Sequence, residues 1–215
     1  CDVVMNVATC HLATVHDFVV DLGDKNDTYS ASSCTNCYLY TDQDYWVWAY
    51  GGAGNDTLTG SANPDYFLES PGVDVTNGLG GDDALFASAI ADGADTFNGG
   101  AGNDLIDYSS RSRPLAVSLD GGRNDGQAGE HDKIASDVES IQGGNGKDTL
   151  TGNARLNFIW GGKGADTING GTGVDHLLGE AGNDMITSKD RSRDQVDGGA
   201  GTDTCTKDSK DRLQR

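Results

Sequence analysis

A nine-residue period restricts the fold of this chain more than any other feature of its sequence. Residues 143–151 read Gly-Gly-Asn-Gly-Lys-Asp-Thr-Leu-Thr, with glycine at positions 1, 2 and 4, aspartate at position 6 and leucine at position 8. Units of the same pattern begin at Gly51, Gly99, Gly161, Gly170, Gly179 and Gly198. Repeats of fixed length form solenoids, because each unit buries its apolar face only by stacking on its neighbours.

Each unit divides into a turn and a very short strand. Glycines allow positive φ and close backbone approach, so the first six residues predict a turn. Position 8 is the one regularly apolar place, so it points inward while positions 7 and 9 point outward. Position 8 holds Leu58, Leu85, Phe97, Ile106, Leu150, Ile159, Ile168, Leu177 and Ile186. Two units make one coil, and coils stack as parallel strands about 4.8 Å apart.

The composition shows that this apolar column is too thin to hold the fold alone. Leu, Ile, Val and Phe together make 40 of 215 residues and the formal charge is −19, a combination typical of disordered chains. Of the 34 acidic residues 30 are Asp, whose short carboxylate suits a turn or a metal ion. A disordered linker is the alternative, but a linker has no reason to keep one apolar position in every unit. We therefore expect bound cations to stabilise the turns.

The unit resembles G-G-x-G-x-D-x-U-x, the nonapeptide of the RTX (repeat-in-toxin, hemolysin-type) calcium-binding repeat family, in which U is a large apolar residue. The resemblance covers residues 51–107 and 143–206. It implies an all-β fold, a right-handed parallel β-roll or β-helix solenoid with several Ca²⁺ ions between stacked turns. It also implies that each ion lies between two turns on the same edge. Its ligands are then the carbonyls of positions 2 and 4 and the Asp of the first turn, and the carbonyls of positions 1 and 3 and the Asp of the second.

Residues 51–107 are the first block of repeats and residues 143–206 the second block. In the second block, the resemblance implies three sites on one edge. The first consists of Gly144, Gly146, Asp148, Gly161, Lys163 and Asp166. The second consists of Gly162, Gly164, Asp166, Gly179, Ala181 and Asp184. The third consists of Glu180, Gly182, Asp184, Gly198, Ala200 and Asp203. Lysine, alanine and glutamate are compatible with these positions, because only their carbonyls are required.

The opposite edge and the first block depart more from the pattern. The opposite edge carries Asn157, Asp175 with Gly171 and Gly173, and Asp194 in a unit without glycine. In the first block the resemblance pairs Asp56 with Asp74, Asp65 with Asp83, Asp74 with Asp95, and Asp83 with Asp104. The other candidate ligands there are Gly52, Gly54, Gly78, Gly80, Gly99 and Ala101. Three extra residues before Ile90 leave the pairings of Asp95 and Asp104 open.

The other segments flank or interrupt the repeats. Residues 1–50 are expected to form degenerate coils or a cap, and residues 207–215 a charged, frayed tail. Residues 108–142 predict a strand at residues 115–119 followed by a polar loop. Asp125, Glu130 and Asp132 lie in this loop, which either binds its own Ca²⁺ or is a solvated turn.

Aromatic residues crowd between residues 38 and 50. Trp46, Trp48 and Tyr50 alternate onto one face of an extended segment, and Tyr45, Val47 and Ala49 onto the other. This aromatic strip is interpreted as an end cap, with a protein–protein interface or a sugar-binding surface as the functional alternatives.

The chain has five cysteines, an odd number, which we interpret as partly disulfide-bonded with one left over. Cys1, Cys10, Cys34 and Cys37 precede the repeats, whereas Cys205 occupies position 8 of the last unit. Because Cys205 is expected at the far end of the solenoid, it is either a buried free thiol or the partner of a cysteine in another subunit. Lipid attachment is a further alternative for Cys1.

The charge and the missing motifs restrict the function. A pI near 4.2 argues against nucleic acid and anionic membranes as partners, and no apolar run is long enough to span a bilayer. Neither H-E-x-x-H nor G-x-S-x-G occurs, so no enzyme is expected. The favoured function is a secreted or cell-surface calcium-binding structural protein that associates with copies of itself, head to tail into extracellular filaments. The alternatives are an adhesin or polysaccharide-binding module and, third, an accessory domain detached from a secreted enzyme.

Overall fold

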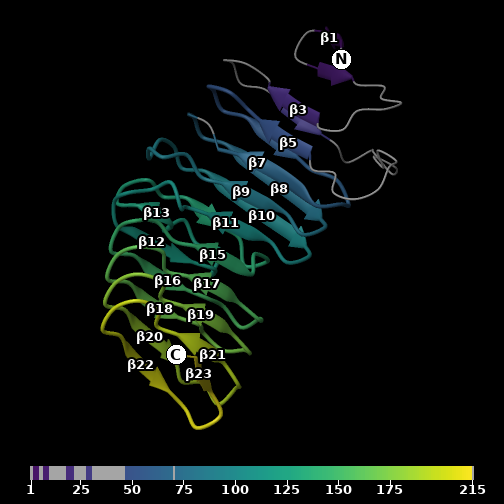
Figure 1. The fold of residues 1–215 in the computed structure, drawn as a ribbon. Coiled ribbons are helices and arrows are strands. Elements are labelled where there is room, and N and C mark those ends of the chain that lie inside the picture. Colours follow the sequence, from purple (N-terminus) through teal and green to yellow (C-terminus); the bar gives the residue numbers. More distant parts are fainter. Residues whose placement is uncertain are drawn as a thin grey trace.

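The computed structural model describes residues 2–4, 7–9, 18–21, 28–30, 47–69 and 71–214. Every regular element in these residues is a β-strand, and most strands pair in parallel with the strand one coil away (Figure 1). The coils stack along one axis from the N-terminal to the C-terminal end of the chain (Figure 1). The chain is thus an all-β parallel solenoid, as the repeat predicted.

One sheet, which we call the long sheet, runs through the whole solenoid. Its ten strands are β3 (Phe18–Asp21), β5 (Val47–Tyr50), β7 (Asp65–Leu68), β9 (Ala84–Phe86), β11 (Leu105–Asp107), β15 (Ser140–Gln142), β17 (Phe158–Trp160), β19 (His176–Leu178), β21 (Gln195–Asp197) and β23 (Arg212–Gln214). Because β23 pairs with β21, residues 212–214 continue the solenoid and are not the frayed tail that the sequence suggested.

The opposite face is divided into two sheets. The N-terminal sheet contains β4 (Thr28–Ser30), β6 (Thr57–Thr59), β8 (Val75–Gly80), β10 (Thr96–Ala101) and β14 (Lys133–Ile134). The C-terminal sheet contains β12 (Leu115–Ser118), β13 (Gly126–Gln127), β16 (Thr149–Thr151), β18 (Thr167–Asn169), β20 (Met185–Ser188) and β22 (Thr204–Lys207). A separate antiparallel pair is formed by β1 (Asp2–Val4) and β2 (Val7–Thr9).

The division falls at residues 108–134, which we call the insert. The antiparallel pair β12–β13 lies within it, and β14 follows at its end. Leu115, Val117 and Leu119 of the insert are at most 3% exposed and extend the core past the break. The long sheet continues beside the insert because β11 pairs directly with β15. The insert therefore replaces one coil on one face only.

The core is a single column of position-8 side chains. Ile141, Ile159 and Leu177 occupy matching registers of the long sheet, and Leu150 and Ile168 do so in the C-terminal sheet. Each is 0% exposed. The nine residues that the sequence assigned to position 8 are all buried. This narrow core confirms the inward position of the repeat and leaves the turns to be stabilised separately.

Aromatic side chains stack along the outer face of the long sheet. The ring of Tyr66 lies 5.0 Å from that of Trp48 and 5.7 Å from that of Phe86, between centroids, with planes 20–25° apart. Phe158 stacks on His176 at 4.7 Å. Trp48 lies on the outer face of the sheet and Ala49 is 1% exposed, as the alternation predicted. The other aromatic residues of the strip, Tyr38, Tyr40, Tyr45 and Trp46, are not among the described residues. Because the rings face one another, they contribute to coil stacking and offer mainly their edges to a ligand.

Candidate calcium sites

The turns form two edges of the solenoid, and each turn ends in a position-6 residue. Turns that leave the long sheet form what we call the first edge, and turns that return to it form the second edge. The position-6 residues of the first edge are Asp56, Asp74, Asp95, Asp132, Asp148, Asp166, Asp184 and Asp203. Those of the second edge are Asp65, Asp83, Asp104, Glu139, Asn157, Asp175, Asp194 and Asp211.

Hydrogen bonds connect position 6 of one coil to position 6 of the next. The N–H of Asp148 donates to Oδ1 of Asp166 at 2.8 Å, and the N–H of Asp166 donates to Oδ1 of Asp184 at 2.8 Å. The N–H of Asp184 donates in the same way to Asp203 at 2.9 Å. One oxygen of each carboxylate thus belongs to the stacking of the coils.

The structure also places the acidic pairs of the first block. Asp56 pairs with Asp74, Asp65 with Asp83, Asp74 with Asp95, and Asp83 with Asp104, with N–H to Oδ1 distances of 2.7–2.9 Å. The last two pairs are 21 residues apart instead of 18. The extra residues before Ile90 are therefore accommodated in the turn, and the pairing that the sequence left open is present.

The second carboxylate oxygen of several position-6 residues is buried without a hydrogen-bond partner. This holds for Asp83, Asp95, Asp104, Asp166, Asp184 and Asp194. In the turn at Gly161 this oxygen folds back over the backbone, so that a Cβ at Gly161 would lie 2.8 Å from Oδ2 of Asp166. Neither Asp166 nor Asp184 forms an ion pair within the described residues. Buried carboxylates in this state require a cation or a proton.

Burial changes the acidity of these groups. It raises the pKa of Asp166 to about 6 and that of Asp175 to about 7. In the first block it raises the pKa of Asp83 to about 8 and that of Asp104 to about 6. The carboxylates one coil away raise these pKa values further. A cation beside the unpartnered oxygens would favour the ionised forms, and the all-oxygen donor set fits Ca²⁺.

Some of the carbonyls that the resemblance assigns to the ions also accept backbone hydrogen bonds from the neighbouring coil. The carbonyl of Gly144 accepts the N–H of Lys163 at 2.9 Å, and that of Gly162 accepts the N–H of Ala181 at 2.9 Å. The carbonyl of Ala181 accepts the N–H of Gly164 at 2.9 Å. Since a carbonyl has two lone pairs, these hydrogen bonds leave one of them for an ion.

Two turn conformations occur among the candidate sites. Gly162, Glu180 and Gly199, all at position 2, have left-handed φ values of 94°, 67° and 80°. Gly144 is not left-handed, and its N–H donates to Oδ2 of Asp148 at 2.8 Å. The second and third candidate sites of this block are therefore built from two left-handed turns each. In the first site, one of the two turns has its carboxylate occupied by the protein.

On the second edge, around Glu139 and Asn157, protein groups take the place of a bound cation. Arg155 supplies a positive charge, and Asn157 is neutral. Arg155 forms a 2.6 Å ion pair with Glu139, which accepts the N–H of Asp104 at 3.1 Å in the place of a position-6 Asp. Asn157 donates from Nδ2 to the carbonyl of Glu139 at 3.1 Å and accepts the N–H of Asn153 at 2.8 Å. This stretch of the second edge therefore has less need of a cation than the first edge.

The three carboxylates in the loop of the insert are neither exposed nor unpaired. Asp125 is 1% exposed and accepts the N–H groups of Ser118 at 2.6 Å and Ile134 at 2.9 Å. Asp132 accepts the hydroxyl of Tyr108 at 3.1 Å, and Glu130 accepts Arg111. The solvated turn considered from the sequence is therefore wrong, because all three carboxylates are buried and bind protein donors.

Sequence reasoning did not single out Glu69, Asp92 or Arg111. The replacement of a position-1 glycine by Glu69 was the signal in the repeat that pointed to an unusual turn. Arg111 is 0% exposed and carried no periodic signal.

Cys205 is a half-buried free thiol, in register with Ile186. The other four cysteines lie outside the described residues.

The described part of the chain contains no helix with the length and apolar character needed to cross a bilayer.

No curated protein matches the sequence. Five segments match the RTX calcium-binding nonapeptide repeat, at residues 48–67, 91–110, 136–154, 151–186 and 190–206. These segments together make up about half of the chain. With its repeats stacked as a parallel solenoid and its position-6 carboxylates aligned, the chain belongs to the RTX calcium-binding nonapeptide repeat family.

Proposed function

We propose that this chain is a calcium-stabilised structural solenoid, with a mechanical rather than a catalytic role. The observation that carries the proposal is the row of buried carboxylate oxygens without partners, at Asp166 and Asp184 above all. The apolar column contributes one side chain per strand, and the hydrogen bonds between successive turns leave the buried charge of the second carboxylate oxygens uncompensated. Ions that bind only the folded turns supply it by mass action.

Several ions are proposed, and the sites differ in strength. The two sites built on Asp166, Asp184 and Asp203 have left-handed turns on both sides, which supports them as the strongest. The site between Asp148 and Asp166 ranks below them because Gly144 already occupies one oxygen of Asp148. The first block contributes further sites along both of its edges.

We place the protein outside the cell or on its surface. Sites built mainly from carbonyls, with one or two carboxylates, fall in the weak range of roughly 10⁻⁴–10⁻³ M that is typical of extracellular calcium modules. A net charge of −19 destabilises the compact rod by self-repulsion unless cations neutralise the acidic turns. The calcium-rich exterior therefore supports this location.

We further propose that copies associate end to end. Among the described residues β22 and β23 each have one unpaired strand edge, and Leu213 of β23 is 46% exposed. Open parallel edges pair readily with a further coil, of the same polypeptide or of another copy. A head-to-tail contact of this kind does not close and propagates into filaments. The mutual stacking of Trp48 and Tyr66 supports this structural role over sugar binding.

Circular dichroism in millimolar Ca²⁺ and in excess EGTA tests the central proposal. With calcium we expect a β-sheet spectrum and cooperative thermal unfolding. In the chelator we expect that spectrum to be lost, and to return when calcium is added back. An identical spectrum and melting temperature in both buffers would show that calcium does not stabilise the fold. Light scattering after size exclusion, with and without reductant, tests self-association separately, and a monomer at all concentrations contradicts it.

A further inference from the structure

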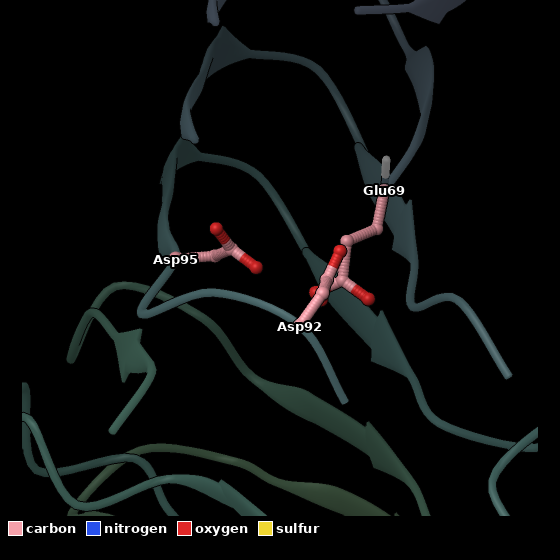
Figure 2. A group of neighbouring side chains, drawn as sticks. All are labelled: Glu69, Asp92 and Asp95. Carbon is pink, nitrogen blue, oxygen red and sulfur yellow. The ribbon is translucent and has the colours of Figure 1, made fainter. Parts of the chain in front are cut away.

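A second group of carboxylates lies at the junction between the first repeat block and the insert. Glu69 follows β7, Asp92 lies in the turn after β9, and Asp95 precedes β10. One carboxylate oxygen from each of the three lies within 4.8 Å of the other two. Asp95 points across the turn toward Glu69 and Asp92, which lie side by side (Figure 2). Two turns, one after β7 and one between β9 and β10, thus direct acidic groups to one point.

This group is short of positive charge. The side chain of Glu69 is 3% exposed and Asp95 is 5% exposed, so water does not compensate them. Oδ1 of Asp95 accepts the N–H of Asp74 at 2.7 Å, but its buried Oδ2 has no hydrogen-bond partner. A buried and unpartnered carboxylate oxygen directed at two other carboxylates is unstable without a bound cation or a shared proton.

The nearest cationic side chain is already used. Nη2 of Arg111 donates to Oε2 of Glu69 at 3.0 Å and to Oε1 of Glu130 at 2.7 Å. One guanidinium is therefore divided between two buried glutamates. It leaves the buried charge of Asp95 without compensation, while Asp92 is exposed at the rim of the group.

We propose that Glu69, Asp92 and Asp95 bind a Ca²⁺ ion through their side chains, at a site that the repeat pattern does not contain. In the repeat, the residues at positions 1 and 3 supply only carbonyls, whereas Glu69 and Asp92 occupy these positions and supply carboxylates. The ligand atoms are all oxygen and come from two separate turns. Ca²⁺ accepts such irregular oxygen sites more readily than Mg²⁺, and Zn²⁺ prefers nitrogen or sulfur.

The position of this ion suggests its role. Glu69 contacts the insert through Arg111, and the N–H of Asp95 donates to Oδ1 of Asp132 at 3.0 Å. The ion would thus connect the insert to the first block at the point where the face opposite the long sheet is divided into two sheets. It extends the proposed stabilisation by calcium to the insert, where β10 and β16 do not pair directly with each other.

The number of calcium ions per chain, measured by equilibrium dialysis and elemental analysis at saturating free Ca²⁺, tests the proposal. Asp92→Asn and the double variant Glu69→Gln/Asp92→Asn keep both backbone carbonyls, so they leave a repeat-type site intact. Asp82→Asn is the matched control: an exposed turn aspartate on the second edge whose Oδ1 accepts the N–H of Asn103 at 2.9 Å. We expect one ion fewer per chain in both variants and the wild-type number in the control.

The outcomes separate this site from the repeat sites. Wild-type protein that binds several ions, with variants that bind the same number, would show that the three carboxylates share a proton and would overturn this proposal alone. Wild-type protein that binds no calcium would overturn the proposed function as well. Loss of several ions or of the β-sheet spectrum in Asp92→Asn would assign Asp92 to the fold and not to one site, which also contradicts the proposal.

Discussion

The N–H of Asp148 donates to Oδ1 of Asp166 at 2.8 Å, while the other carboxylate oxygen of Asp166 is buried without a partner. The same side chain thus has one oxygen in the stacking of the coils and one directed into the turn. Loss of its charge and loss of its hydrogen bond are separable by substitution, because asparagine keeps an acceptor oxygen but not the charge. The first prediction uses this difference.

Asp166→Asn should change stability in opposite directions with and without calcium. With calcium it weakens two adjacent sites, and we expect a loss of about 2 kcal/mol or more in the free energy of unfolding. In EGTA it removes an uncompensated buried charge and should raise the melting temperature. With calcium, Asp194→Asn on the second edge should lower the free energy of unfolding by less. Thermal unfolding in both buffers measures this, and equal losses for the two variants with calcium would contradict the ranking of the edges.

The chelated protein should become less stable as the pH rises. Unfolded aspartates titrate near pH 4, whereas burial raises the pKa of folded Asp166 to about 6 and that of Asp83 to about 8. Between these values the folded state binds more protons than the unfolded state, so the free energy of unfolding falls from about pH 4 to about pH 8. Urea unfolding in EGTA at pH 5 and pH 8 measures the difference. Greater stability at pH 8 would show that these carboxyls are not buried as described.

Gly164→Ala should be far more destabilising than Gly80→Ala. Gly164 has a φ of 139°, and a Cβ there would lie 1.7 Å from the carbonyl oxygen of Gly146. A Cβ at Gly80 would meet no atom closer than 3.6 Å. We expect a loss of roughly 3 kcal/mol or more for Gly164→Ala and a change within about 1 kcal/mol for Gly80→Ala. Chemical denaturation in calcium measures both, and similar losses would refute the close approach of the turns.

Arg111→Met should destabilise the junction strongly, whereas Arg155→Met should not. Arg111 is 0% exposed between Glu69 and Glu130, so its removal leaves two buried carboxylates and is expected to cost about 3–5 kcal/mol. The side chain of Arg155 is 54% exposed in its pair with Glu139, and its loss should cost at most about 1 kcal/mol. Urea unfolding at saturating calcium compares them. A small effect of Arg111→Met would mean that water or a cation already compensates the two glutamates.

Part of this structure follows directly from the period. Leu150 stacks on Ile168 and Asp166 on Asp184 because equal positions of adjacent, equivalent coils must meet. Any residue 18 places away in a regular stretch is thus a known neighbour. The inward column and the pairing of position-6 acids in the second block needed no further information.

Where the period is broken, strand register decides the neighbours. Asp74 meets Asp95 although three extra residues separate their units, because Val75 of β8 pairs with Thr96 of β10. A shift by one residue would turn the buried side chains of these strands outward, so the strands keep their register and the turn accommodates the insertion.

The sequence by itself determined the solenoid, its inward column and the regular acidic pairs, whereas the tertiary structure decided the conformation of individual turns and the junction. Gly144 is a glycine without left-handed φ, because the carbonyl of Arg111 accepts the N–H of Asn145 at 2.8 Å and the insert takes the place of a repeat turn. Arg111 meets Glu69 and Glu130 from 42 and 19 residues away. No period relates these three positions, so only the packing of the insert against the repeats brings them together.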